Sequence, residues 1–261
     1  MKLLPGAGCG ALLFLLLPHP ASAQWQGKAG AAIRGVSHTE DDRAGRRLVR
    51  ETGWLPGIGV EAAYTSGSLT WFGAAEWYRA DIGYRGQTQA GVAAASTTAT
   101  NLAALRLGAR YTIGGGYSLI AAAEADLWKR DIRSTGSSVG LQERYRSERL
   151  IAGVGKAWQL PGAVVAADFS VLFVTPERMR VGFSNLLDTA SLETKRARGI
   201  RIGTHYRPAF APSLELRASL DWIRTARSED APVTRNGQFA GTIAQPEHAR
   251  QALTLGVSTL F

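Results

Sequence analysis

The sequence alternates between apolar and polar side chains over many short stretches, and two of these stretches show the pattern most clearly. Residues 119–127 place leucine or alanine at every second position, whereas the positions between them include Glu124 and Asp126. Residues 214–222 repeat the pattern, with glutamate, arginine, serine and aspartate between the apolar positions. Because side chains of a β-strand point alternately to opposite faces, each stretch predicts a strand with one apolar face and one charged face. The fold must give these two faces different surroundings.

Ten segments carry such strand-like patterns, and the connections between them alternate between short and long. Tight turns at one end and long loops at the other are typical of a closed antiparallel β-barrel in a membrane. We therefore predict an all-β transmembrane barrel of ten strands, with eight or twelve as alternatives, short periplasmic turns and long extracellular loops. The long loops are residues 39–52, 81–100, 131–142, 175–191 and 225–249. The predicted strands are residues 24–38, 53–65, 69–80, 101–111, 117–130, 143–158, 163–174, 192–206, 214–224 and 250–261.

Aromatic residues lie near the ends of these predicted strands, on the face that the apolar pattern turns outward. Aromatic rings prefer the boundary between lipid head groups and water, so two groups of them predict two membrane interfaces. The alternative is that they are ordinary core residues of a soluble β protein. The predicted lower girdle, near the termini and short turns, is Trp25, Tyr64, Trp71, Tyr111, Tyr117, Tyr206 and Phe261. The predicted upper girdle, near the long loops, is Trp54, Trp77, Phe173 and Trp222.

The charged faces of the strands must share an interior, because hydrocarbon cannot solvate charged groups. An interior crowded with opposite charges favours a network of salt bridges over a wide pore. Only the segment 143–158 has an ambiguous phase, since Lys156 interrupts its apolar face. The predicted interior network is Lys28, Arg34, Glu61, Glu76, Arg106, Arg110, Glu124, Asp126, Asp168, Arg201, His205, Glu215, Arg217 and Asp221.

The first 23 residues have the features of an export signal. Lys2 precedes an uninterrupted apolar run over residues 11–17, and Ala21-Ser22-Ala23 forms a cleavage site. Cys9 precedes the apolar run, so we expect no lipidation, and no cysteine follows the cleavage site. We predict a cleaved signal peptide, residues 1–23, and a barrel, residues 24–261, in the outer membrane of a Gram-negative bacterium.

The chain is basic, with 30 lysine and arginine residues against 21 acidic residues and a net charge of +9. An exported protein does not meet nucleic acid, so the excess indicates an anionic partner such as lipopolysaccharide. Guanidinium groups suit bidentate phosphate recognition, and many arginines lie on or beside the long loops. A generic solvated loop surface is the alternative. The hypothetical lipopolysaccharide-binding rim is Arg130, Arg133, Arg144, Arg146, Arg149, Arg178, Arg180, Arg196 and Arg198.

The histidines show no spacing that suggests a metal site, and we predict no cofactor. His38, at the end of the first predicted strand, lies close to Glu40 in the first predicted loop, and we interpret this region as a solvated loop neutralised by neighbouring arginines. His205 is predicted to be a hydrogen-bonded interior residue. His248 lies in the last loop with only Glu247 as an acidic neighbour in the sequence.

The whole layout resembles that of known outer-membrane barrels. The last segment ends on Phe261, and it is similar to the terminal strands that the barrel-assembly machinery recognises, which makes that machinery an expected partner. The export signal, ten strands, five long loops and final phenylalanine resemble the omptins, outer-membrane aspartate/histidine proteases. The resemblance is strongest over residues 191–230, where a charged strand leads to Tyr206, a proline-containing turn and Asp221-Trp222-Ile223-Arg224.

Omptin activity implies an acidic pair above the third strand and an Asp/His pair above the seventh. The first region has Asp81 without an acidic partner, and the second has Glu177 without a histidine. We therefore assign no catalytic residue and favour a non-enzymatic barrel, either a structural or surface-interaction protein or a narrow channel. One alternative is an omptin-like hydrolase in which Asp81 and Glu177 converge over the barrel mouth. The other is a porin for an anionic solute, lined by Arg106, Arg110, Arg201 and Arg217.

Overall fold

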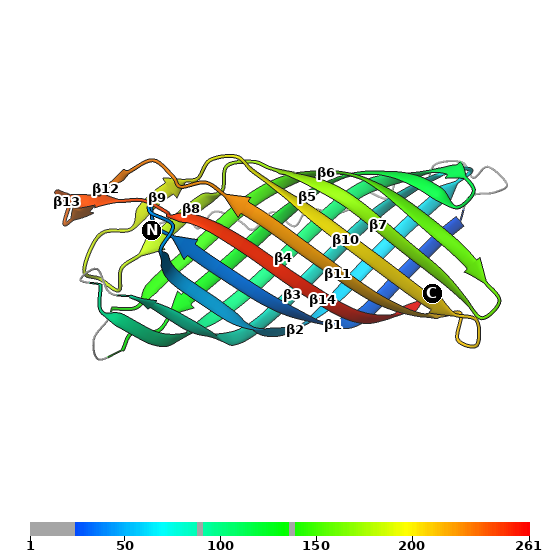
Figure 1. Ribbon diagram of the computed structural model, residues 1–261, viewed down its shortest axis with the longest axis horizontal. Coiled ribbons are helices and arrows are strands. Elements are labelled where there is room, and N and C mark those ends of the chain that lie inside the picture. Colours follow the sequence, from blue (N-terminus) through cyan, green and yellow to red (C-terminus); the bar gives the residue numbers. More distant parts are fainter. Residues whose placement is uncertain (1–23, 88–90, 136–138) are drawn as a thin grey trace, which may run out of the picture.

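Ten antiparallel strands close into a single barrel, which confirms the predicted fold. The computed structural model describes residues 24–87, 91–135 and 139–261. The sheet order is β5-β4-β3-β2-β1-β14-β11-β10-β7-β6, and β6 pairs with β5 to close the ring (Figure 1). Within the described residues, no helix has the length and apolar character needed to cross a membrane. The predicted signal peptide lies outside the described residues.

Two further pairs of short strands extend the long-loop end. β8 (Arg178–Gly182) pairs with the start of β6, and β9 (Ala190–Glu193) pairs with β8. β12 (Ala231–Arg235) and β13 (Gln238–Ile243) form a separate hairpin, which projects from the left end of the barrel in Figure 1. The ten wall strands are β1 (Gln24–Asp41), β2 (Arg47–Ser66), β3 (Leu69–Gln87), β4 (Ala93–Gly114), β5 (Tyr117–Ile132), β6 (Leu141–Leu160), β7 (Ala163–Val174), β10 (Ala197–Pro208), β11 (Leu214–Thr225) and β14 (Glu247–Leu260).

Several strands are longer than the sequence indicated. β1 and β2 run on through most of the predicted loop 39–52 and leave only a tight turn between them. Above the apolar stretches the two faces of these strands no longer alternate between apolar and charged residues, while the backbone pairing continues. The predicted strand 192–206 is also divided, because its first residues belong to β9 and the wall strand β10 begins at Ala197.

The barrel has the polarity of a membrane protein, with large apolar side chains outside and charged ones inside. Leu107, Leu150 and Val154 are 54–62% exposed, whereas Glu124 and Arg201 are buried. A soluble protein would bury such leucines, because each is worth roughly 2 kcal/mol when removed from water. The exposed apolar faces therefore indicate that lipid surrounds the wall.

The aromatic residues of the predicted girdles lie on this outer face. Trp25, Tyr64 and Trp71 occupy one cross-strand row over β1, β2 and β3 at the short-turn end. The Trp25 and Tyr64 ring centroids are 5.0 Å apart. Lys156, whose strand phase was ambiguous, joins the same girdle, because its ammonium group lies 4.1 Å from the centre of the Tyr117 ring. The inward face of β6 is thus the one that carries Arg149.

Candidate functional site

A network of ion pairs crosses the middle of the barrel interior. Glu124 on β5 accepts hydrogen bonds from Arg201 on β10 at 3.0 and 3.2 Å, from Arg149 on β6 at 2.8 Å and from Arg106 on β4 at 2.7 Å. Asp221 on β11 accepts two more from Arg201, at 2.7 and 3.0 Å. β6 and β7 separate β5 from β10 in the ring, so these contacts join non-adjacent strands through the barrel interior. We call this group of side chains the central network.

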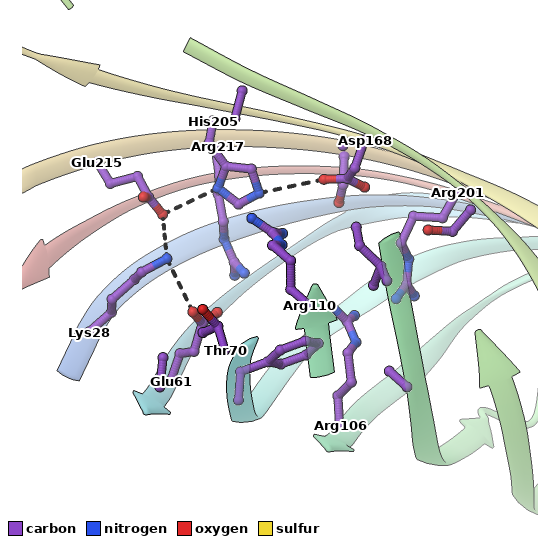
Figure 2. Close-up of a pocket in the computed structure, with 18 of the residues that line it drawn as sticks. Lys28, Glu61, Thr70, Arg106, Arg110, Asp168, Arg201, His205, Glu215 and Arg217 are labelled. Carbon is purple, nitrogen blue, oxygen red and sulfur yellow. Dashed lines mark hydrogen bonds and ion pairs between the residues drawn. The ribbon is translucent and has the colours of Figure 1, made fainter. Parts of the chain in front are cut away.

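Below the central network the interior opens into a pocket of about 380 Å³ at the short-turn end (Figure 2). Lys28 binds both Glu61 at 3.1 Å and Glu215 at 2.9 Å. His205 lies between Glu215, at 3.2 Å, and Asp168, at 3.8 Å. His205 is therefore an interior residue held by two carboxylates, as Figure 2 shows.

Above the central network a second cluster surrounds Arg130, which is only 2% exposed. Its guanidinium group donates to Glu51 at 2.9 Å, to Glu143 at 2.5 Å and to Glu40 at 3.3 Å. The Tyr145 hydroxyl donates to Glu143 at 3.0 Å. We call these residues the upper cluster. One cation thus holds three buried carboxylates together.

Two histidine–carboxylate pairs adjoin the upper cluster. The interpretation of His38 and Glu40 as part of a solvated loop was wrong, because both lie on β1 and are only 2% and 7% exposed, and the second pair was not predicted. A ring nitrogen of His38 lies 2.9 Å from Glu40, and one of His248 lies 3.1 Å from Glu177. The two histidine ring centroids are 5.4 Å apart. The alternation of β1 could have indicated the first pair, because His38 and Glu40 are two positions apart and therefore point to the same, inward face of the strand. The second pair joins residues 71 positions apart, and nothing in the sequence indicates it.

Glu143 and Glu177, which belong to this region, have pKa values shifted in opposite directions. Glu143 precedes Leu150 by seven positions, and the apolar outer face of β6 begins at Leu150. Glu143 therefore lies on the long-loop side of the membrane-spanning segment. Burial, together with the charges of Glu40 and Glu51, raises its pKa to about 7 against the lowering effect of Arg130. Glu177 lies in the connection between β7 and β8. Burial alone would raise its pKa, but the charge of Arg250 and the His248 hydrogen bond lower it to about 2.

The predicted interior residues all lie inside the barrel, whereas two of the predicted rim residues do not lie on the rim. Arg130 and Arg149 are 2% and 4% exposed and belong to the upper cluster and the central network. Both were assigned to the rim because they stand near long loops in the sequence. Their strand phase is inward, however, and the strands run past the predicted loop boundaries. The exposed rim residues are Arg133, Arg144, Arg146, Arg178, Arg180, Arg196 and Arg198.

Five of the outward-facing cations form a compact group on β5, β6 and β8. Lys129 is opposite Arg144, and Arg144 is also opposite Arg180. Arg146 is opposite Arg178 in the next row. We call these five residues the cationic band. It stands directly above the apolar outer face, since Leu127 on β5 is opposite Arg146 and is 48% exposed.

The arrangement expected of an omptin-like hydrolase is only half present. Glu177 does have a histidine, but Glu177 and His248 are 0% and 1% exposed, so neither meets the solvent. Asp81 is exposed and binds Arg133 rather than an acidic partner or a histidine. Within the described part of the chain, no three histidine, cysteine or acidic side chains are grouped so as to hold a metal ion.

Comparison with solved structures places the fold among outer-membrane barrels. No protein-family model matches the chain, and no curated protein matches it in sequence. The outer membrane protease OmpT from Escherichia coli is similar with a TM-score of 0.62 and 10% identity, covering 91% of this chain and 96% of that chain. The translocator domain of autotransporter NalP from Neisseria meningitidis gives a TM-score of 0.47 and 14% identity, covering 89% of this chain and 88% of that chain. The chain thus has an outer-membrane β-barrel fold. Its ten-stranded layout is that of the omptins.

Proposed function

We propose that this protein is a closed, non-enzymatic barrel of a bacterial outer membrane, which binds lipopolysaccharide on its outer wall. The central network carries the first part of the proposal. The ion pairs of Glu124 with Arg201, Arg149 and Arg106 join β5 to β10, β6 and β4 inside the barrel and would obstruct the lumen at that level. The upper cluster and its two histidine–carboxylate pairs form a second layer of buried side chains inside the barrel, closer to the long loops. Both layers lie in series, so a solute would have to displace both.

Such a barrel should not conduct ions. The protein refolded as residues 24–261 into a planar lipid bilayer is expected to give no discrete current steps, because two hydrogen-bonded layers obstruct the lumen. The heat-dependent shift in electrophoretic mobility that folded barrels show would verify that the sample is folded. Discrete steps with a preference for anions would contradict the proposal and would favour a porin for an anionic solute.

The cationic band supports the lipopolysaccharide part of the proposal. Like charges placed directly opposite each other destabilise a sheet, yet Arg144 faces both Lys129 and Arg180. Among the residues that the structure describes, only Arg146 of the five forms an ion pair, with Glu148 at 3.7 Å, and both of these side chains are half exposed or more. The band lies where the apolar outer wall ends. Phosphate groups of the outer leaflet would meet it at this level and offset the repulsion.

Removing three charges of the band should weaken lipopolysaccharide binding strongly. The variant Arg144→Ser, Arg178→Ser, Arg180→Ser is expected to bind roughly 100-fold more weakly, since a cation near an anionic surface contributes about 1 kcal/mol. The affinity can be measured by isothermal titration of purified lipopolysaccharide into the barrel in detergent.

A matched control separates the band from the general charge of the protein. The variant Arg43→Ser, Arg46→Ser, Arg235→Ser also loses three positive charges, but from exposed connections and the β12–β13 hairpin. It should retain wild-type affinity. Equal losses in both triple variants would mean that no defined band exists.

A further inference from the structure

We propose that the pocket at the short-turn end binds a small organic anion with an apolar body, such as an aromatic carboxylate, and that Arg110 binds its charge. The short turns face the periplasm in the orientation of the proposed function, so the ligand would come from that side. The binding itself does not depend on this orientation or on lipopolysaccharide. Arg106 and Arg201 of the central network form the upper boundary of this pocket (Figure 2), whereas no residue of the upper cluster lines it.

Arg110 is the unusual residue of this pocket. The other arginines that line it form ion pairs: Arg217 binds Glu76 at 2.5 Å and Arg207 binds Glu215 at 3.3 Å, for example. Among the residues that the structure describes, no hydrogen bond or ion pair reaches Arg110, although the side chain is partly buried. An arginine in a half-closed lumen without a carboxylate has donors left for a ligand.

The pairing of the strands explains why Arg110 has no acidic partner among the described residues. Its cross-strand neighbours are Thr70 on β3 and Ile120 on β5, and neither carries a charge. Phe72 and Ala122, the next inward residues on the same two strands, also line the pocket. The wall around Arg110 is therefore largely apolar, in contrast to the opposite wall with Lys28, Glu215 and His205.

This combination fits an anion with an apolar body better than a bare inorganic ion. The guanidinium group offers a planar pair of donors to a carboxylate, and the adjoining apolar surface would cover a ring or a branched chain. The pocket volume of about 380 Å³ falls within the range of small-molecule sites. Seven cationic side chains line the pocket against five acidic ones, which also favours an anion.

The inference can be tested with 4-fluorobenzoate as the probe and ¹⁹F NMR as the measurement. Residues 24–261 folded in zwitterionic detergent should broaden and shift the probe signal in a saturable manner. Arg110→Gln should weaken this binding by about tenfold, because it removes a charge-assisted hydrogen bond. Arg110→Lys should retain part of it. The uncharged probe 4-fluorobenzyl alcohol should bind weakly and equally to the wild type and to Arg110→Gln.

Two controls keep the outcome clear. Arg43→Gln removes the same charge from an exposed connection and should bind the probe as the wild type does. Micelle uptake of the probe would be identical in all samples, so equal signals in the wild type and Arg110→Gln would overturn the inference. If Arg110→Gln does not fold, the wild type still decides: the side-chain Nε resonance of Arg110 should shift on addition of 4-fluorobenzoate, and an unmoved resonance would overturn the inference.

Discussion

Replacing Arg130 with methionine should lower the free energy of unfolding of the barrel by about 4 kcal/mol. Methionine preserves much of the side-chain volume, so the main loss is the positive charge. Glu40, Glu51 and Glu143 would then be buried together without a cation, and each is less than a tenth exposed. Urea-induced unfolding of the variant and the wild type in lipid vesicles would measure the difference.

The loss caused by Arg130→Met should also depend on pH. Burial raises the pKa of Glu143 to about 7 in the folded protein, above the value of about 4.5 for an unperturbed glutamate. A raised carboxyl pKa means that the folded state prefers the protonated form, so this group reduces stability as pH rises from about 4.5 through 7. Arg130 opposes that effect, and without it the decline should be steeper. The difference between variant and wild type is therefore expected to be larger at pH 8 than at pH 5.

A neighbouring arginine provides the control for this experiment. Arg133→Met removes a cation three residues along the chain, where the side chain is exposed and pairs with exposed Asp81. It should change stability by less than about 1 kcal/mol, since exposed salt bridges contribute little. A similarly small effect of Arg130→Met, with no dependence on pH, would show that the upper cluster does not stabilise the fold.

Replacing Glu124 with alanine is the second change for which we expect a large effect, again about 4 kcal/mol. Glu124 is the shared acceptor of Arg106, Arg149 and Arg201, and it is 4% exposed. Without it three buried or half-buried guanidinium groups repel each other in the middle of the lumen. The same urea titration would measure the loss.

Glu148→Ala serves as the matched control, because in the described part of the chain the Glu148 carboxylate pairs only with exposed Arg146, at 3.7 Å. Its expected effect is below about 0.5 kcal/mol. The double variant Glu124→Ala, Arg201→Ala should lose less than the sum of the two single losses, since each single change leaves the other charge unpaired. Additive losses would argue that the two side chains are not coupled across the lumen.

The sequence alone was sufficient for the class of fold and for the orientation of most side chains. Alternation with period two assigned an outward and an inward face to each strand, because the two faces meet lipid and an enclosed polar interior. Interior residues such as Glu124, Arg201 and His205 and girdle residues such as Trp25 followed from that phase alone. The strand ends could not be predicted, because beyond the lipid the two faces no longer have different surroundings and the alternation is lost, as in β1 and β2.

Only the tertiary structure decided which charges meet. Arg130 and Arg149 stand beside predicted loops in the sequence, yet the closed ring of strands turns them inward to carboxylates from other strands. Glu177 contacts His248, 71 positions away in the sequence. Among the described residues Arg110 pairs with no carboxylate, because Thr70 and Ile120 flank it on the neighbouring strands. The physical reason is that alternation is a local property of one strand. Pairing across the lumen depends on the register and number of all ten strands.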